Sequence, residues 1–442
     1  MFAAKRVFVV YPSPQLKKDA RFGYSIECLS LATVIKSEGF ATSYFDFSLN
    51  VLENDLVRQV GYEPECSIVV LYLDSVPLHR SSNVENGLAL ISRLRREVPA
   101  AKIIACGPWC MCSSSDVAGS DETWHGEPEY CFYTAISKLH PRAEKTSIAL
   151  LADLGKLPIP DRSFLPDLRI IEHQYGLERS AVVQTTRGCS NGCLFCPRQA
   201  WTARLVRHRR IEDCANEVIS LVSSGVRNIW IDDDNMGADP NWSSAFFDAV
   251  AQRRTGLGDY GIYFSTDVNV DGGIFSRAHR AGARIVSFGI ESAAVGVRRY
   301  FHKATSDSNI RKAVCQADKA GLFTVGNFIV GAPVESEADI RQTCQLIREL
   351  PFDEINVKIL SVVQGAPLWK ECVRKGFLAG DSICEFACRE TGVSKFSMAE
   401  LRERQKIVYD TFRADERNRV RLALKIRAFG MPYFMMNDGE CV

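Results

Sequence analysis

Hydrophobic and polar positions in the first 140 residues alternate between a strand-like and a helix-like period. Apolar runs rich in β-branched or aromatic residues stand at 6–10, 43–47, 67–73 and 102–106. Helix-like patterns lie between them at 25–37 and 86–97. Because buried strands that alternate with helices pack as a parallel sheet, this segment predicts a doubly wound, Rossmann-like α/β domain. Ligands of such sheets bind beyond the carboxyl ends of the strands, here the loops at 12–23, 74–82 and 107–115.

A second alternation begins at residue 181, after a proline-containing stretch at 141–180 that lacks periodicity and predicts a linker. Its strand candidates are 181–186, 228–232, 262–267, 284–289, 323–330 and 354–360. Helix patterns between them include 214–224, 308–320 and 337–350. Six such units fall short of the eight in a full barrel. The expected organisation is a Rossmann-like domain at 1–140, the linker, a partial (β/α)6 barrel at 181–370 and a helical C-terminal cap at 371–442.

Composition narrows the function classes. The formal net charge of +1 gives no electrostatic reason to expect a nucleic-acid partner or an anionic membrane surface. No apolar run reaches the roughly 18 residues that a membrane span needs. The 16 cysteines stand in a chain without a recognisable export signal. This favours metal or redox chemistry over disulfides and predicts a cytoplasmic location.

The strongest chemical signal is the Cys-x3-Cys-x2-Cys spacing of Cys189, Cys193 and Cys196, directly after the predicted strand at 181–186. Thiolates are the usual ligands of iron–sulfur clusters, and a [4Fe–4S] cubane ordinarily takes four. Three closely spaced thiolates would leave one iron open to another molecule. A structural zinc site is disfavoured, because zinc motifs usually pair two Cys-x2-Cys halves and no second half of suitable spacing follows.

With this motif, residues 181–370 resemble the radical S-adenosylmethionine (SAM) superfamily. The resemblance implies that the open iron binds the amino and carboxylate groups of SAM. It also implies that the reduced cluster cleaves SAM to a 5′-deoxyadenosyl radical. Cys189, Cys193 and Cys196 are then both the metal ligands and the catalytic residues.

The same resemblance assigns SAM-binding roles to residues at the ends of several predicted strands. Phe195 is expected near the adenine, Glu291 at the ribose hydroxyls, and the acidic run after the strand at 228–232 at the amino group. The cofactor-binding candidates are Phe195, Asp232, Asp233, Asp234, Ser265, Asp267, Glu291, Ser292, Asn327 and Gly331.

The N-terminal segment resembles the cobalamin-binding domain that precedes the barrel in many radical SAM enzymes. Matching features are Tyr11-Pro12, Gly39-Phe40, Asp46 and the stretch at 126–129. Two features depart from that pattern. The Asp-x-His-x-x-Gly signature is absent, and the strand at 102–106 is followed by one glycine, Gly107, where two usually let the backbone approach the nucleotide tail. Two hypotheses therefore stay open: bound cobalamin, or a retained domain that shapes the substrate pocket.

The leading functional hypothesis is hydrogen abstraction from a small polar metabolite, such as a sugar or aminocyclitol in antibiotic biosynthesis. The compact layout resembles radical dehydratases of the apramycin type, which implies dehydration, a lyase reaction. The alternative is a cobalamin-dependent radical SAM C-methyltransferase. The resemblance also implies an electron donor such as flavodoxin or ferredoxin. If the reaction is a dehydration, a separate reductase is expected to act on its product.

Other cysteines suggest further metal sites, each weighed against isolated buried thiols. A methylthiotransferase-like second cluster would use Cys28, Cys66 and Cys106; an auxiliary cluster would use Cys372, Cys384, Cys388 and Cys441; a strand-end site would use Cys106, Cys110 and Cys112. Isolated thiols are the favoured interpretation of all three sets. Part of the basic run at 204–210 is expected to contact the SAM carboxylate or the substrate, and the rest to form a solvent-exposed face. A non-enzymatic role as an iron–sulfur sensor is disfavoured, because the residues expected to bind SAM would then be unnecessary.

Overall fold

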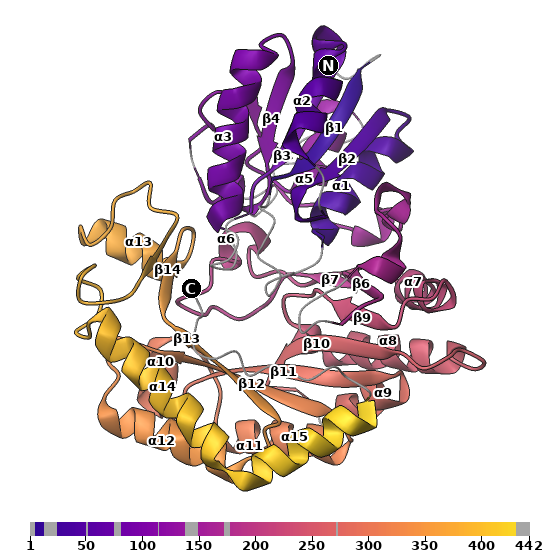
Figure 1. Cartoon of the computed structure of the whole chain (residues 1–442). Coiled ribbons are helices and arrows are strands. Elements are labelled where there is room, and N and C mark those ends of the chain that lie inside the picture. Colours follow the sequence, from indigo (N-terminus) through magenta and orange to yellow (C-terminus); the bar gives the residue numbers. More distant parts are fainter. Residues whose placement is uncertain are drawn as a thin grey trace.

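The computed structural model describes residues 5–12, 24–49, 52–74, 81–113, 115–137, 149–171, 177–270 and 273–429. The expected ligand loops at 12–23 and 74–82 lie largely outside these ranges, as do Pro141 and Cys441. Two parallel sheets dominate the structure, the N-terminal one above the second in Figure 1. This α/β architecture confirms the predicted fold class.

The N-terminal sheet has five strands in the order β2-β1-β3-β4-β5, all paired in parallel. The strands are β1 (Arg6–Tyr11), β2 (Ala41–Asp46), β3 (Ser67–Tyr72), β4 (Lys102–Cys106) and β5 (Glu122–Thr123). Helices α1 (Ile26–Ser37) and α5 (Pro128–Ala135) pack on one face, and α2 (Glu53–Gly61) and α3 (Ser81–Glu97) on the other. Since helices cover both faces, the central strands are apolar throughout and do not alternate.

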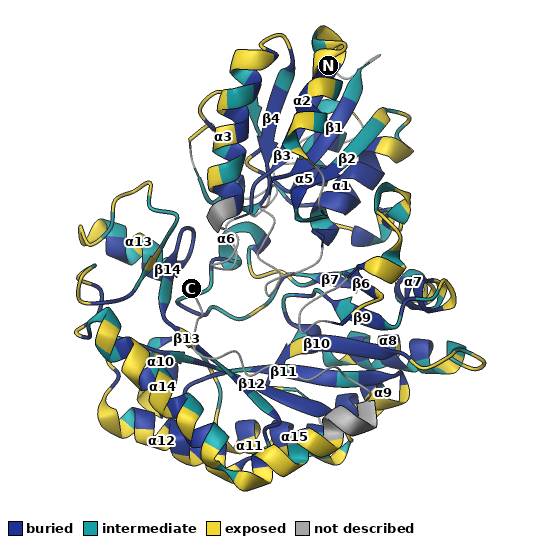
Figure 2. Ribbon diagram, viewed as in Figure 1, coloured by how far each residue is buried: buried dark blue, intermediate teal, exposed yellow. Residues whose placement is uncertain are grey.

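The second sheet has six parallel strands in the order β13-β12-β11-β10-β9-β6. They are β6 (Ser180–Val183), β9 (Asn228–Ile231), β10 (Gly261–Asp267), β11 (Ala283–Glu291), β12 (Phe323–Val330) and β13 (Glu354–Ile359). The outer helices are α7 (Ile211–Ser223), α8 (Pro240–Arg253), α9 (Gly273–Arg280), α11 (Asp307–Lys319) and α12 (Glu337–Glu349). Strands β6 and β13 form the two edges, so the sheet curves as a partial barrel. Figure 2 shows its strands mostly buried and the outer helix faces exposed.

The predicted linker packs on both sheets. Short 3-10 turns at Leu154–Lys156, Arg162–Phe164 and Leu168–Ile170 replace regular structure. Leu154 joins the N-terminal core, whereas Arg162 donates to Val182 O at 2.7 Å and pairs with Glu217 in the barrel.

The C-terminal region is mostly helical, as predicted. It holds α13 (Pro367–Arg374), α14 (Met398–Ala414) and α15 (Glu416–Phe429), but also an antiparallel pair of β14 (Ser361–Val363) and β15 (Cys384–Phe386). Short, half-buried strands such as β15 carry too little periodicity to be recognised in the sequence. Within the described ranges, no helix is both long and apolar enough to cross a bilayer.

Candidate functional site at the cysteine loop

The three cysteines lie on the loop between the short strands β7 (Thr186–Arg187) and β8 (Arg207–His208), which also carries α6 (Gln199–Thr202). Cys193 is buried, and Cys189 and Cys196 are half-buried. The amide of Cys196 donates to Cys193 O at 3.1 Å, and Gln199 Nε2 donates to the same carbonyl at 3.0 Å. These bonds hold two of the three thiols in one tight turn.

Glycine is required where the loop begins. Gly188 has φ +101°, and a Cβ built there would lie 1.8 Å from Leu205 O. The backbone therefore passes against the returning chain at a distance that only glycine allows.

The acidic run after β9 fastens the start of this loop. Asp233 Oδ1 accepts from the amides of Thr185 at 2.7 Å and Thr186 at 3.0 Å, and its other oxygen accepts from both hydroxyls. Asp234 accepts from Gly188 N at 2.7 Å and pairs with Arg198. Burial raises the pKa of Asp233 to about 6. Two of the three aspartates expected at the SAM amino group are thus engaged in holding the loop, and Asp232 is half-buried beside them.

A buried lysine joins two other predicted residues. Lys303 Nζ lies 2.8 Å from Asp267 Oδ2 and 3.2 Å from Glu291 Oε1. Asn191, between Cys189 and Cys193, donates to the same Asp267 oxygen at 3.0 Å. Burial opposes the charge on Lys303, but Glu291 and Asp267 together raise its pKa above the ordinary value.

Lys303 was not among the predicted site residues. It follows α10 (Val295–Tyr300) as a single lysine and belongs to no motif considered in the sequence. The only hint in the sequence is that Lys303 follows Glu291 by twelve residues, and the short helix α10 lies between them.

The next three candidates lie on the cysteine loop (Phe195) and directly after strands β11 (Ser292) and β12 (Gly331). Phe195 packs edge-on against Phe301, with ring centroids 5.2 Å apart. Ser292 is buried, and its carbonyl accepts from Arg298. Gly331 donates its amide to Glu335 Oε2 at 2.8 Å.

Ser265 and Asn327 line a polar face of the sheet. Ser265 is exposed and pairs in register with half-buried Ser287, whose Oγ accepts from Asn327 Nδ2 at 2.7 Å. Their strand neighbours, such as Phe264 and Phe288, point into the core packed by the outer helices. The face that carries the serines is therefore available to polar ligands.

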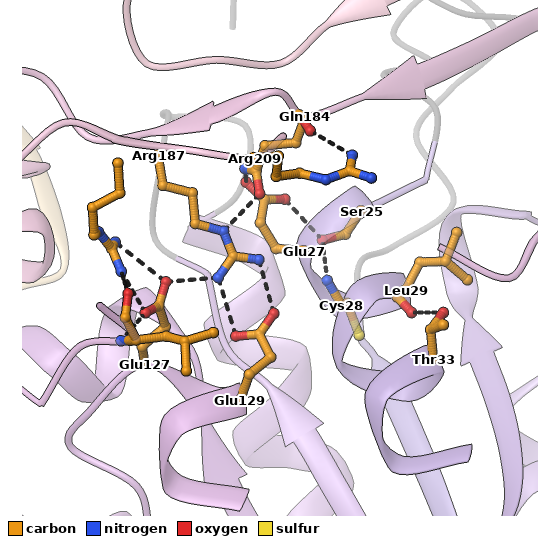
Figure 3. A network of polar contacts seen from close by, with 12 residues as sticks. Ser25, Glu27, Cys28, Leu29, Thr33, Glu127, Glu129, Gln184, Arg187 and Arg209 are labelled. Carbon is orange, nitrogen blue, oxygen red and sulfur yellow. Dashed lines mark hydrogen bonds and ion pairs between the residues drawn. The ribbon is translucent and has the colours of Figure 1, made fainter. Parts of the chain in front are cut away.

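The N-terminal domain contacts the cysteine loop through a buried polar network (Figure 3). Arg187, directly before Gly188, pairs with Glu127 at 2.6 Å and with Glu129 at 2.8 Å. Arg207 pairs with the other oxygen of Glu127 at 2.7 Å. The stretch at 126–129, which resembles part of a cobalamin-binding domain, thus also anchors the loop.

The chemistry of the thiol loop fits an iron–sulfur cluster, because three thiolates from one short loop can each bind a separate iron. Among the described residues, no three His, Cys, Asp or Glu side chains are grouped closely enough to hold one ion, and the described cysteines are free thiols. A cubane spreads its thiolates over separate irons, so it needs wider spacing than one ion. Burial raises the pKa of Cys193 to about 12, so its thiolate requires compensating positive charge, which iron would supply.

Comparison with known proteins agrees with this geometry. The Radical SAM superfamily profile matches residues 183–347, which include the cysteine loop and strands β9 to β12. The chain thus carries a radical SAM domain, whose cofactors are a [4Fe–4S] cluster and SAM.

The named relatives are similar over part of their length. An uncharacterized methyltransferase of Pyrococcus horikoshii is 26% identical over 52% of this chain and 49% of its own. The cytidylyl-2-hydroxyethylphosphonate methyltransferase of Streptomyces wedmorensis is 23% identical over 57% of this chain and 50% of its own. The chain therefore spans about half the length of the curated relatives it matches.

Two solved structures share the fold across both sheets. The radical SAM methyltransferase TsrM of Kitasatospora setae, bound to tryptophan and a SAM analogue, superposes with a TM-score of 0.65 at 16% identity, covering 84% of this chain and 76% of TsrM. The cobalamin-dependent radical SAM enzyme OxsB superposes with a TM-score of 0.65 at 12% identity, covering 99% of this chain and 77% of OxsB. A second structure of TsrM contains cobalamin and a [4Fe–4S] cluster, and the OxsB structure contains aqua-cobalamin and SAM.

Proposed function

We propose that this protein abstracts a hydrogen atom from a small polar metabolite with the 5′-deoxyadenosyl radical that its [4Fe–4S] cluster generates from SAM. The observation that carries the proposal is that the cysteine loop contacts a cluster of three charged residues, Asp267, Glu291 and Lys303. Asn191 of the loop contacts Asp267, which shares Lys303 with Glu291. Both carboxylates and the ammonium group therefore lie beside the cysteine loop, and they would offer partners to the hydroxyl, amino and carboxylate groups of SAM.

For the substrate we favour a sugar or aminocyclitol. One face of the barrel sheet carries exposed Ser265 and half-buried Ser287, Asn327 and Asn356, with exposed Lys358 at its edge. Hydroxyl and amide side chains donate and accept hydrogen bonds, as a polyol or aminopolyol requires. These hydroxyl and amide groups support a polar substrate.

For the reaction we favour radical dehydration without cobalamin. The supporting observation is the packing of α4 (Pro108–Cys112) at the carboxyl end of β4. A Cβ on Gly107 would lie 2.6 Å from Leu73 O, and Trp109 Nε1 donates to Gln364 Oε1 of the barrel at 2.7 Å. A buried nucleotide tail needs close backbone approach at this end of the sheet. The close packing around Gly107 and Trp109 is what favours a reaction without cobalamin in this proposal.

Cobalamin-dependent methyl transfer is the second candidate. It is favoured by the named activities of the relatives from Pyrococcus horikoshii and Streptomyces wedmorensis and by the cobalamin bound in TsrM and OxsB. Under this alternative, the ends of the N-terminal strands would hold the corrin.

One experiment separates the two candidates. The protein is expressed with and without cobalamin uptake, reconstituted anaerobically with iron and sulfide, and given SAM, dithionite and a panel of sugars and aminocyclitols. 5′-Deoxyadenosine and product mass are then measured. A product lighter by one water from cobalamin-free protein supports dehydration. A product heavier by one methylene group, formed only by corrin-loaded protein, supports methyl transfer. Absence of 5′-deoxyadenosine with every substrate would contradict hydrogen abstraction.

A further inference from the structure

Asn235 lies between the cysteine loop and the neighbouring barrel strand. It follows the acidic run after β9 and is buried. Its Nδ2 donates to Cys189 Sγ at 3.7 Å. Its Oδ1 accepts from Asp267 N at 3.0 Å and from Thr266 Oγ1 at 3.3 Å, both at the end of β10.

These contacts fix which end of the amide faces the sulfur. The oxygen and nitrogen of an asparagine amide are assigned from the hydrogen bonds around them. A backbone N–H only donates, so the group facing Asp267 N must be the amide oxygen. The NH2 group is then left to face Cys189. A neutral donor therefore points at this sulfur, held in place by strand β10.

We propose that Asn235 is a positioning residue that raises the reduction potential of the cluster through its N–H···S bond to Cys189. Reduction adds negative charge to the cluster and its thiolates, and a donor aimed at a ligand sulfur stabilises that charge. The same amide accepts from Asp267 N, and Asp267 contacts Lys303 and Asn191. The residue that sets the potential is thus hydrogen-bonded to the group expected at SAM.

The inference rests on the cluster assignment and not on the substrate. Its test is an anaerobic redox titration of the reconstituted protein, followed by electron paramagnetic resonance, with no SAM and no substrate present. The variants are Asn235→Asp and Asn235→Ala. The control is Asn241→Asp, which makes the same charge change at an exposed position near the start of α8.

We expect the potential to fall in both Asn235 variants. In Asn235→Asp, one carboxylate oxygen still accepts from Asp267 N while the other brings negative charge to the sulfur. The ratio of reduced to oxidised cluster at a fixed solution potential should fall about tenfold, which corresponds to about 59 mV for one electron. Asn235→Ala should shift in the same direction by less, and the control should match the wild type.

Three results would overturn the inference. One is an unchanged potential in both Asn235 variants at full iron and sulfide content. A second is an equal fall in Asn241→Asp, which would indicate a general charge effect. The third is loss of the cluster from both Asn235 variants although they unfold at the wild-type denaturant concentration, because the contact would then only hold the loop together. If the Asn235 variants show the expected shifts in potential but the wild type forms no 5′-deoxyadenosine, the proposed function is contradicted and the inference about Asn235 is not.

Discussion

At the scale of single residues, Glu291 combines an unusual backbone with a buried charge. Its φ is +67°, in the left-handed region, where the register between β11 and β12 shifts. Such a backbone costs on the order of 1–3 kcal/mol in a residue other than glycine and persists where surrounding contacts determine it. The bond to Lys303 is one such contact.

We therefore expect Glu291→Gln to weaken SAM binding while the cluster is retained. A hydroxyl contributes about 1.5–3 kcal/mol when it bonds a carboxylate and about 0.5–1.5 kcal/mol when it bonds a neutral amide, so the affinity should fall roughly 5- to 10-fold. Equilibrium binding of SAM to the reconstituted protein measures the effect, and iron content checks the cluster. Glu349→Gln, on the outer helix α12, is the control. Wild-type affinity in Glu291→Gln would assign the ribose contact elsewhere, with Ser265 or Asp267 as the next candidates.

The cluster ligands give a stronger prediction. Cys189→Ala, Cys193→Ala and Cys196→Ala should each abolish 5′-deoxyadenosine formation with dithionite, because a cubane short of one thiolate loses iron. Cys315→Ala removes an exposed thiol from helix α11 and should behave as wild type. Normal SAM cleavage by any of the three loop variants would refute the assignment of the cluster.

The sequence identifies residues whose role depends on local spacing and misses those placed by distant contacts. The thiols of Cys189, Cys193 and Cys196 belong to one short loop, so their spacing alone indicates a cluster. The roles of Lys303 and Asn235 depend on contacts with residues that are distant in the sequence, Asp267 and Cys189 respectively. Asp233 was expected at SAM because it follows a strand end, yet its four bonds go to Thr185, between the short strands β6 and β7, and to Thr186, at the start of β7. No pattern along the chain distinguishes these two uses of a carboxylate.

At the scale of elements, long periodic segments were predicted within a few residues, and short ones were not. The strand expected at 323–330 is β12 itself. The one expected at 181–186 is divided into β6 and β7, because Thr185 turns toward Asp233. Helix α2 and strands β5, β14 and β15 were not predicted. The three strands are only two or three residues long, so hydrophobic periodicity is weak in them, whereas α2 buries one face through Leu56, Val57 and Val60.

The open edge of the barrel at β13 is covered by side chains of α14. Tyr409 Oη accepts from Val357 N at 3.0 Å, and Gln405 Nε2 donates to Val357 O at 2.6 Å. Unpaired backbone groups on an edge strand invite pairing with another chain. Helix α14 therefore occupies the position that a seventh strand would take.

We expect Gln405→Leu to lower the free energy of unfolding by about 1–3 kcal/mol, since a buried carbonyl loses its donor. Urea unfolding measures this loss, and light scattering at rising protein concentration measures edge pairing. Lys406→Leu, on the exposed part of the same helix, is the control for a polar-to-apolar change. Equal aggregation of the two variants would mean that surface hydrophobicity, and not the exposed edge, causes it.

At the scale of the whole molecule, buried charges hold the two sheets together. Glu127 accepts from Arg187 and Arg207 of the barrel and from Leu151 N of the linker at 2.6 Å. Gln184 Nε2 also donates across the interface to Glu27 at 3.1 Å. The sequence indicates two α/β units and the stretch at 126–129, but it gives no sign that this stretch contacts the residue before Gly188. Such pairing between distant segments emerges only in the folded chain.

The last prediction concerns this interface. Glu127→Gln should lower the free energy of unfolding at pH 7 by about 3–5 kcal/mol, because removing one charge from a buried ion pair leaves its partners uncompensated. It should also reduce the iron retained after reconstitution, since Arg187 directly precedes the cysteine loop. Glu122→Gln is the control. It loses a half-exposed pair with Lys102 in the same domain and should cost no more than about 1 kcal/mol.

The pH dependence of Glu127→Gln tests the cause of the destabilisation. Burial favours the protonated acid, but Arg187 and Arg207 hold the pKa of Glu127 below its ordinary value. A carboxylate with a lowered pKa stabilises the fold above the pKa of the unfolded chain and loses that contribution as the pH falls through the folded value. The difference between wild type and Glu127→Gln in urea unfolding should therefore be full at pH 7 and narrow as the pH falls below about 4.5. A difference that stays constant down to the acid transition would indicate that the shape of the Glu127 side chain, and not its charge, joins the two sheets.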